Sequence, residues 1–171
     1  NTDQTVNTTL SNFARLDIFK GLTLNSQLTF VYSSNKKNFY EPSTTRTEGD
    51  GLASYSLYTR RNLSSDLYLS YFKTMENHEF TALAGQKVDY NRYEDMGLNA
   101  IGFGSDAIKV INNRYSQDEI NGFTDLSANA LISYFARFSY KFKKRYIISG
   151  SFSLDGSSRF GSENRFGFFP V

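Results

Sequence analysis

The sequence predicts an all-β protein, an antiparallel β-barrel segment whose strands cross a membrane. Apolar and polar residues alternate with a period of two along several long segments, as they do on the two faces of a strand. The composition favours strands, with 16% aromatic residues and only 2 Pro. Residues 22–33 form an uncharged alternating run. Soluble strands are usually about 5–6 residues long, whereas membrane-crossing strands need about 9–11. Length therefore favours the membrane interpretation.

Composition also excludes several classes of protein. The net charge of +2 is too small to indicate nucleic-acid binding. The absence of Cys excludes a disulfide framework, a thiol nucleophile and a thiolate metal site. No apolar run of about 18 residues is present, so a membrane-spanning helix is not expected. The mean hydropathy of −0.47 resembles that of a soluble protein, but alternating barrel strands average to such values.

The first half of the chain is expected to form hairpins. No helix or strand is predicted for residues 1–9, which are polar. The chain is expected to be a mature or truncated segment, because Asn1 is not a start residue. A tight turn is predicted at Lys20 and Gly21, where Gly permits a positive φ. Polar loops or turns are predicted at 34–51, 61–65 and 74–77. The predicted strands in this half are 10–19, 22–33, 52–60, 66–73 and 78–90.

The second half contains a long insertion and the clearest strands. Residues 91–125 are too long for a hairpin loop, and loops of that length are usually functional or disordered. Residues 126–141 are predicted to be the longest strand, with eight uncharged positions on one face. A basic turn at 142–144, a strand from Tyr146 to Asp155, a polar loop at 155–165 and a strand start at Phe166 follow. These elements make seven strands and the beginning of an eighth. Short turns and long loops tend to alternate, as in outer-membrane barrels.

The end of the chain carries a specific order of motifs. A strand that begins Arg-Tyr-Ile-Ile precedes the run Asp-Gly-Ser-Ser-Arg-Phe-Gly, and a second strand start reads Arg-Phe-Gly-Phe-Phe-Pro. This order resembles the later part of the barrel in SusC/RagA-type TonB-dependent outer-membrane transporters. The family often has Arg at position 153 and Trp at position 166, where this chain has Ser and Phe. The motif residues are Arg145, Tyr146, Asp155, Gly156, Ser157, Ser158, Arg159, Phe160, Gly161, Arg165, Phe169 and Pro170.

The resemblance implies a function for the whole protein. It implies energised uptake of glycans or peptides across the bacterial outer membrane, with a SusD-like surface lipoprotein and TonB as partners. Residues 1–171 are then a piece of the wall and extracellular loops of a larger barrel, in which neither a plug domain nor a TonB box is recognised. No catalysis, cofactor, metal or nucleic acid is expected on this interpretation.

The polar face of the strands is the candidate transport surface. In a transporter barrel, inward polar residues would line a wet lumen and face the plug, whereas in a soluble sandwich the same residues would face solvent. The alternation alone does not separate these two arrangements. The candidate lumen-facing residues are Asn25, Gln27, Thr29, Asn129, Ser133 and Arg137.

Residues that could carry other chemistry are better explained structurally. His78 is the single histidine, and no nucleophile and orienting acid can be assigned to it. Asp89, Glu94 and Asp95 lack the spacing of a calcium loop and are interpreted as a solvated loop. The sequence Asp-Gly-Ser-Ser that begins at Asp155 is interpreted as an Asx-type turn. Gly97, Gly102 and Gly104 lack the Lys that a phosphate-binding loop requires, so they are interpreted as loop glycines.

One basic cluster suggests a membrane surface. Lys141, Lys143, Lys144 and Arg145 surround the predicted turn, where basic side chains can reach lipid head groups. Tyr140 and Tyr146 flank the cluster and Tyr32 and Tyr90 could serve at the opposite edge, as in the aromatic girdles of barrels. The alternative is that Tyr is simply a good strand residue.

Two other classes of protein remain open at this point. One is a soluble β-sandwich that binds carbohydrate through aromatic loops. The other is a small self-contained outer-membrane barrel with a structural role, since about eight strands can close a barrel. As an isolated fragment, the chain would expose two strand edges, which favour aggregation.

Overall fold

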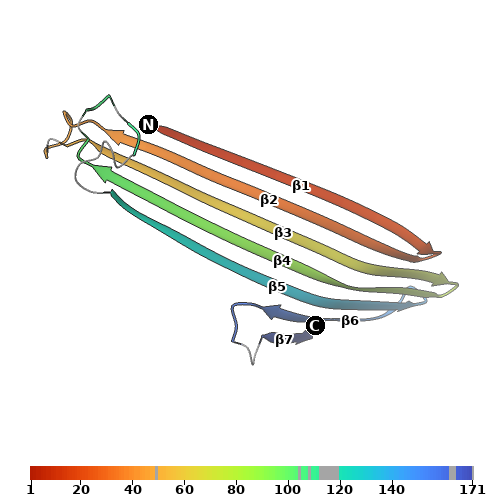
Figure 1. The fold of residues 1–171 in the computed structure, drawn as a ribbon. Helices are drawn as coiled ribbons and strands as arrows, with labels where there is room; N and C mark the ends of the chain where they lie inside the picture. Colours follow the sequence, from red (N-terminus) through yellow and green to blue (C-terminus); the bar gives the residue numbers. More distant parts are fainter. Residues whose placement is uncertain (49, 104, 108, 112–119, 162–164, 171) are drawn as a thin grey trace. The chain divides into compact units, whose positions relative to one another are not determined.

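The structure is a computed structural model that describes residues 1–48, 50–103, 105–107, 109–111, 120–161 and 165–170. Over these residues the chain forms one seven-stranded sheet in which every strand pairs with its neighbours in the sequence (Figure 1). No helix among the described residues is long and apolar enough to span a membrane. The strands are β1 (Thr2–Phe19), β2 (Leu22–Glu41), β3 (Leu52–Met75), β4 (His78–Ile101), β5 (Ile120–Phe142), β6 (Tyr146–Ser157) and β7 (Phe166–Pro170).

The described residues group into two compact units. The loop unit contains Asn1–Thr8, Val31–Arg61 and Arg92–Ser127. The turn unit contains Thr9–Phe30, Asn62–Asn91 and Ala128–Val171. Strands β1 to β5 contribute residues to both units.

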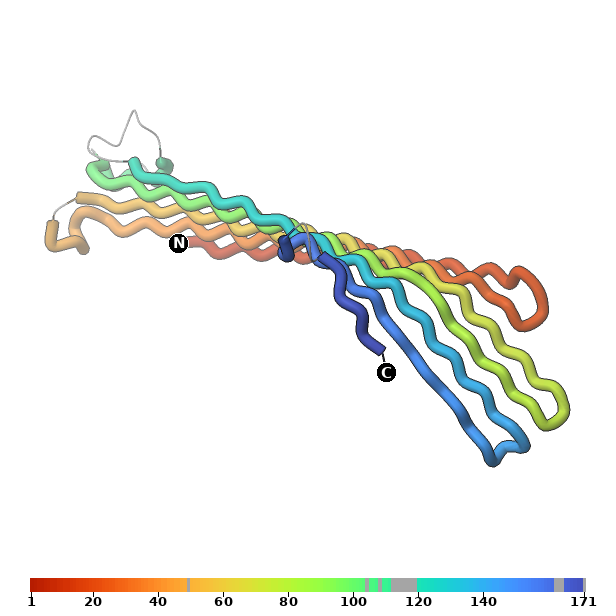
Figure 2. The backbone as a smooth tube through the Cα atoms, turned by 90° about the horizontal axis from the view of Figure 1, so that it is seen from below, coloured from red at the N-terminus to blue at the C-terminus, as the bar shows by residue number. Residues whose placement is uncertain are grey.

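The three short hairpin connections belong to the turn unit, and two of the three long ones belong to the loop unit. The third long connection, 158–165, joins β6 to β7 within the turn unit and lies partly outside the described residues. The turn unit has connections at 20–21, 76–77 and 143–145, which lie at one end of its strands (Figure 2). The loop unit contains the segments 42–51 and 102–119, both of which lie partly outside the described residues. Short and long connections therefore alternate strictly from β1 to β6, which matches the pattern of outer-membrane barrels.

The predicted turn at 61–65 is wrong, and β3 runs through it without interruption. The Asn62 side chain donates a hydrogen bond to Asn91 Oδ1 on β4 at 2.8 Å, so this polar stretch stays in the sheet. Four of the five residues at 61–65 are polar, so their composition resembles that of a turn although the backbone stays in the sheet. Joining the two predicted strands reduces the expected count from eight to the observed seven.

Residues 1–9, for which no helix or strand is predicted, are mostly strand, and the strands also extend into the predicted loops at 34–51 and 91–125. β1 begins at Thr2 rather than at residue 10, β2 continues to Glu41, and β4 continues to Ile101. The first nine residues are held by side chains of β2, since Ser33 donates to Asn7 Oδ1 at 2.6 Å and Asn35 donates to Asp3 Oδ1 at 3.0 Å. Charged and polar residues interrupt the hydrophobic periodicity in these segments, but backbone pairing continues.

Other boundaries shift by less. β5 starts at Ile120, and β3 and β4, with 24 residues each, are longer than its 23. β6 extends to Ser157, so the predicted loop at 155–165 starts three residues later. The strand start at Phe166 is confirmed. Gly85 allows the close backbone approach suggested by its sequence position, because an added Cβ would lie 2.5 Å from Leu67 O.

Buried apolar residues are few, and they belong to the loop unit. Ala53, Ala100 and Phe103 are buried, with Tyr40 and Ile111 packed against them. In contrast, large apolar side chains of the turn unit are exposed, including Leu16 at 60% and Ile148 at 62%. A sheet with so small a core requires another surface to cover its apolar side chains.

Candidate functional site

The register of β5, β6 and β7 separates an apolar face from a polar face. Tyr134 pairs with Leu154 and Ala136 with Phe152, and these positions define the apolar face. Ser133 pairs with Asp155, on the opposite face, which we call the polar face. Phe168 of β7 pairs with Leu154 and extends the apolar face to the last strand. The register therefore places the apolar residues of neighbouring strands on one face and their polar residues on the other.

Side-chain contacts extend the polar face across the turn unit. Each neighbouring pair of strands from β1 to β5 is connected by hydrogen-bonded polar side chains. Such contacts require the partners to project from the same face of the sheet. The connections are Ser11–Thr29 at 3.4 Å, Thr23–Ser70 at 2.6 Å, Asn62–Asn91 at 2.8 Å and Asn91–Asn129 at 3.4 Å.

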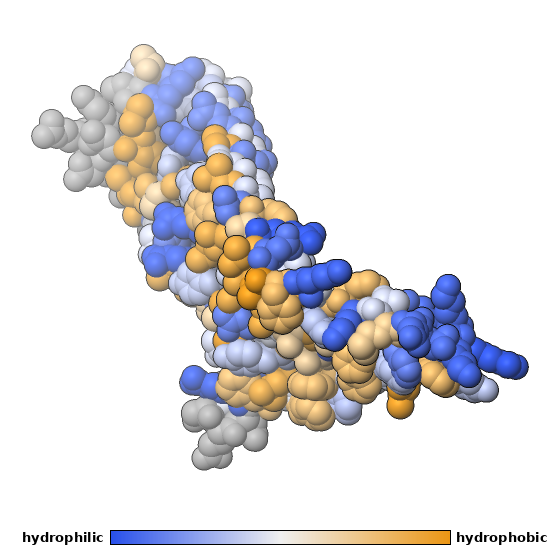
Figure 3. Space-filling view, turned by 90° about the vertical axis from the view of Figure 1, so that its right-hand side faces the viewer, coloured by the Kyte–Doolittle hydropathy of each residue, from blue (hydrophilic) through white to orange (hydrophobic). Residues whose placement is uncertain are grey.

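Charge follows the same division. The polar face of the turn unit carries ion pairs between Arg15 and Asp17 at 3.1 Å, Lys87 and Asp89 at 3.7 Å, and Lys141 and Glu79 at 3.0 Å. On the apolar face of this unit, Lys73 is the single charged residue among the described strand residues, as judged from the alternation of side chains. Lys73 lies close to a hairpin turn. Apolar side chains gather in broad groups on the molecular face displayed in Figure 3. A charged face opposite an uncharged one is the pattern of a barrel wall between water and lipid.

A hollow of about 720 Å³ in the turn unit is lined by polar side chains of the polar face together with aromatic ones. Asn25, only 7% exposed, donates from Nδ2 to Thr23 Oγ1 at 3.2 Å and to Ser70 Oγ at 3.4 Å. Arg15 and Asp17 also line the hollow. The arrangement presents fixed hydrogen-bonding groups beside an ion pair, so it can hold a polar surface against the sheet.

The six predicted lumen-facing residues all lie on the polar face. They do not form one cluster: Asn25 belongs to the hollow, Asn129 contacts Asn91, and Arg137 is beside Ser151. Sequence reasoning missed Asn62 and Asn91, because it assigned them to a turn and an insertion. Each has an apolar neighbour on one side only, Leu63 for Asn62 and Tyr90 for Asn91, so the signal in the sequence is weak. The remaining three are Gln27, Thr29 and Ser133.

The motif residues connect β6 and β7 back to β5. The backbone N–H of Ser158 donates to Ala130 O at 2.9 Å, and the Ala130 N–H donates to Ser158 Oγ at 2.8 Å. The Ser157 N–H donates to Arg165 O at 3.0 Å. Arg145 lies in the preceding basic turn, with its guanidinium 6.0 Å from the Tyr146 ring centroid.

The rest of the motif lies along β6, its connection and β7. Asp155 and Gly156 belong to β6, and Gly156 is buried against the Phe166 ring. Phe169 and Pro170 lie in β7. Arg159, Phe160 and Gly161 are exposed in the connection between the two strands. Most of these motif residues thus lie in strands or in the connection between them.

A second group of interacting side chains holds the loop unit together. Asp106 accepts hydrogen bonds from Tyr40 Oη at 2.8 Å, from the Ser43 N–H at 3.0 Å and from Ser43 Oγ at 2.8 Å. The Ser43 backbone bond, followed by the Tyr40 and Ser43 side-chain bonds, lowers the pKa of Asp106 below its ordinary value of 3.8. Burial, together with Asp106, raises the pKa of Tyr40 to about 12. Asp106 lies inside the segment predicted as an insertion, and no sequence signal marked it.

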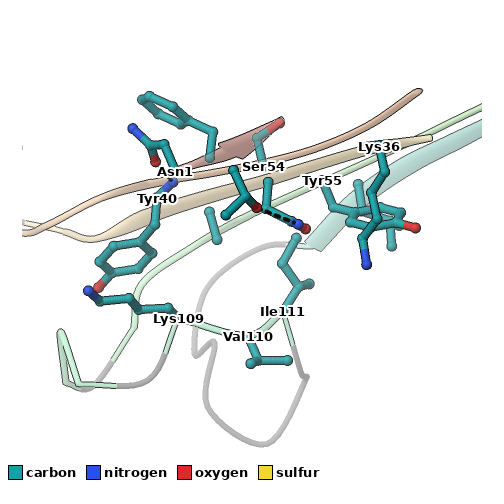
Figure 4. A pocket seen from close by; sticks show the side chains of 13 residues that line it. Asn1, Lys36, Tyr40, Ser54, Tyr55, Lys109, Val110 and Ile111 are labelled. Atoms are coloured by element: carbon teal, nitrogen blue, oxygen red, sulfur yellow. Dashed lines mark hydrogen bonds between the residues drawn. The ribbon is translucent and has the colours of Figure 1, made fainter. Parts of the chain in front are cut away.

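The same unit contains a hollow of about 530 Å³ (Figure 4). Lys36, Tyr40 and Tyr55 line it from β2 and β3, and Lys109 lines it from the following loop segment. Figure 4 shows Val110 and Ile111 opposite the strand residues.

The residues set aside in the sequence have structural partners. His78 Nδ1 lies 2.7 Å from Tyr140 Oη, and its ring centroid lies 5.0 Å from that of Phe142. Glu94 Oε1 forms an ion pair with Arg92 at 2.7 Å. Among the described residues, no group of three or more His, Cys, Asp or Glu could hold a metal ion. The interpretation of Gly97 as a loop glycine is wrong, because it lies in β4. Gly97 and Gly102 are both buried, and Gly104 lies outside the described residues.

Comparison with known proteins identifies the family. The chain is 32% identical over 174 residues to TonB-dependent receptor P39 of Formosa agariphila, a match that covers 100% of this chain and 17% of that protein. It is 31% identical over 112 residues to TonB-dependent receptor SusC of Bacteroides thetaiotaomicron, covering 64% of this chain and 10% of SusC. The chain belongs to the TonB-dependent receptor family. No family model matches it.

Solved structures specify which part of a TonB-dependent receptor the chain represents. It superimposes on the RagAB peptide transporter with a TM-score of 0.88 and 25% identity, over 98% of this chain and 19% of that one. The RagAB peptide importer in the open-open state gives a TM-score of 0.90 at 25% identity, over the same fractions. The chain is therefore a segment of a SusC/RagA-type barrel. It spans 17% and 16% of the length of the first two receptors that it matches.

The barrel assignment replaces the two other folds considered from sequence. The described strands form one sheet rather than the two packed sheets of a sandwich. Their order runs from β1 to β7, and no pairing closes β1 onto β7 within the described residues. A self-contained small barrel would require that pairing.

Proposed function

We propose that the protein containing this chain imports nutrients across the bacterial outer membrane with energy supplied through TonB. The observation that carries the proposal is the division of charge in the turn unit. Ion pairs and hydrogen-bonded side chains occupy the polar face, whereas Leu16, Phe138 and Ile148 are exposed on the uncharged face. The family of the relatives supports a transport role for a wall of this kind.

The chain would contribute barrel wall and extracellular loops. The polar face, with Asn25, Gln27, Thr29, Asn129, Ser133 and Arg137, would line the lumen and face a plug domain located elsewhere in the protein. The segments 42–51 and 102–119 would lie on the extracellular side, because long loops in outer-membrane barrels are extracellular and short turns are periplasmic. The motif residues 155–161 would fix the connection between β6 and β7.

A SusD-like lipoprotein is proposed as the surface partner. RagAB is described as a peptide transporter, and SusC is a TonB-dependent receptor, so the relatives support import in general. The imported compound would be a glycan or a peptide. The hydrogen-bonding groups of the polar face suit either class, because amides, hydroxyls and paired charges bind sugars and peptide backbones alike.

The proposal is tested by uptake in cells that carry the intact receptor. Uptake of labelled oligosaccharide mixtures and peptide mixtures would be compared with and without the receptor gene, and again after disruption of TonB. We expect one of the two classes to lose uptake in both deletions and to regain it on complementation. Unchanged uptake of both classes, or uptake that persists without TonB, would contradict the proposal.

A further inference from the structure

In the loop unit, positively charged side chains lie on the side of the strands where apolar side chains would be expected from the alternation. Tyr32 is the last aromatic of the uncharged run on β2, and Lys36 follows on the same side because side chains alternate along an unbroken strand. On β3 and β4, Thr59 Oγ1 donates to Glu94 at 3.4 Å and Asn62 donates to Asn91, which brings Arg61 opposite Arg92.

Arg61 and Arg92 share one carboxylate. Glu94 Oε1 is 2.7 Å from Arg92 Nη2, and Glu94 Oε2 is 3.7 Å from Arg61 Nη2. Two guanidinium groups against one carboxylate leave a net charge of one. Each guanidinium has five N–H donors, and the ion pair with Glu94 does not use all of them. The pair therefore remains able to bind an anion.

The hollow of about 530 Å³ continues this cationic side. Lys36 Nζ lies 5.6 Å from the Tyr55 ring centroid, and Lys109 Nζ lies 5.8 Å from that of Tyr40. No Asp or Glu is among the described residues that line the hollow, although the charge of Asp106, which accepts a hydrogen bond from Tyr40, interacts with that of Lys109. Leu98, Val110 and Ile111 make part of the hollow apolar. Its lining is thus complementary to a ligand that combines an anion with apolar groups.

Its position selects a lipid over an imported solute. Four residues separate Lys36 from Tyr32, or roughly 13 Å along a strand at about 3.3 Å per residue. An aromatic residue at the end of an uncharged run marks the membrane boundary, so the Lys36 end of the hollow lies at the level of lipid head groups. The Tyr40 end, where Lys109 lies, is roughly another 13 Å farther along β2 from that boundary. The hollow is on the side of β2 away from Asn35 and Lys37, which project with the polar face toward Asp3.

We propose that this hollow binds the phosphate-bearing head group of an anionic lipid in the outer leaflet. Lys36 and Lys109 would contact the phosphate, and Tyr40 and Tyr55 would contact the sugar or glycerol part. Arg61 and Arg92 would hold further anionic groups nearer the membrane boundary. The inference rests on the proposed location of the protein in the outer membrane.

The test uses the intact receptor, purified in detergent and titrated with phosphorylated lipid A or its dephosphorylated form. Native mass spectrometry would count bound lipid. We expect preference for the phosphorylated form and about a 30-fold loss of affinity in the double variant Lys36→Gln, Lys109→Gln at low salt. The control is Lys37→Gln, Lys87→Gln, which removes the same charge from the polar face and should bind as the wild type does.

Several results would overturn the proposal. One is equal binding of the two lipid forms, and another is an equal loss in the two double variants. Displacement of lipid by millimolar inorganic phosphate would assign the site to free phosphate. A change of oligomeric state without lost lipid would assign the surface to a protein contact. Migration shift on heating in SDS would verify that each variant is folded.

The uptake assay separates this proposal from the transport function. The Lys36→Gln, Lys109→Gln variant should lose lipid but retain uptake in cells. If wild-type receptor is absent from outer-membrane fractions or transports nothing, the proposed function fails, whatever the lipid titration yields. If uptake is intact and the lipid preference is missing, only the lipid site fails.

Discussion

Glycines set the spacing between strands at single positions. An added Cβ at Gly85 would lie 2.5 Å from Leu67 O and 2.8 Å from Tyr68 Cα, and backbone atoms of a neighbouring strand cannot move aside cheaply. At Gly156 the nearest atoms belong to the Phe166 ring, which is 56% exposed and can move. Gly161 has no atom within 4 Å of such a Cβ. The same residue type therefore has different importance at each position.

Gly85→Ala should destabilise the intact receptor by about 1–3 kcal/mol, the usual cost of overpacking. The measurement is urea-induced unfolding of receptor folded into phospholipid vesicles. Gly161→Ala is the matched control and should remain within about 0.5 kcal/mol of the wild type, as expected for an open surface position. Equal unfolding midpoints for the two variants would show that β3 and β4 are not held at this spacing.

The contact between Tyr40 and Asp106 predicts a pH dependence at both extremes. Asp106 has a lowered pKa, so its stabilising effect is complete above pH 3.8 and is lost in more acidic solution. Tyr40 has its pKa raised to about 12, so its effect is complete below pH 10.0 and is lost as the pH rises toward 12. The difference in absorbance at 295 nm between wild type and Tyr40→Phe would report the ionisation of Tyr40.

In that titration, Asp106→Asn should lower the pKa of Tyr40 without returning it to 10.0. Burial is the largest cause of the shift and remains in the variant, whereas the hydrogen bond to a charged acceptor and its negative charge are removed. A Tyr40 that already titrates near 10.0 in the wild type would mean that the loop carrying Asp106 is not held against β2.

At the scale of elements, each strand has one apolar face and one polar face, which suit different surroundings. β5 carries Ala136 and Phe138 on the apolar face and Arg137 and Ser139 on the polar face. One-residue slippage would exchange these sets, so the register with β6 is strongly specified wherever one face meets lipid. The same reasoning explains why polar segments such as residues 2–9 remain strand: their neighbours supply hydrogen bonds even where hydrophobic alternation has ended.

Arg substitution should distinguish the two faces of β5. Ala136→Arg puts a charge on the uncharged face and should cost about 2–4 kcal/mol if the position is near the middle of the bilayer. Ser139→Arg, three residues away on the polar face opposite Ser149, should change stability by less than about 1 kcal/mol. Urea unfolding in vesicles measures both. A similar cost for the two variants would be incompatible with a lipid-facing apolar face.

At the scale of the whole molecule, the sheet is open. β1 and β7 are its two edge strands over the described residues, and each presents unpaired backbone groups on one side. The buried cluster formed by Ala53, Ala100 and Phe103 is small. Stability must then come from neighbouring strands of the receptor and from lipid, because apolar side chains on this sheet have little protein to pack against.

Residues 1–171 alone should therefore fail to form a stable monomer in detergent. We expect aggregation on refolding, seen by light scattering, and no folded band that shifts on heating in SDS. The intact receptor is the control and should show both a monodisperse species and the heat-dependent shift. A monomeric, heat-modifiable species from residues 1–171 would instead indicate that β1 and β7 can close on each other.

The amino-acid sequence by itself determined the class of fold and the face of each strand, because alternation depends only on successive side chains. It placed Asn25, Asn129 and Arg137 on the polar face, and its terminal motif indicated the family. Tertiary structure decided where strands end, since Asn62 and residues 2–9 are kept in the sheet by partners far away in the chain. It also assembled Tyr40 with Asp106 and Lys36 with Lys109, because loop closure brings together residues that no local pattern relates.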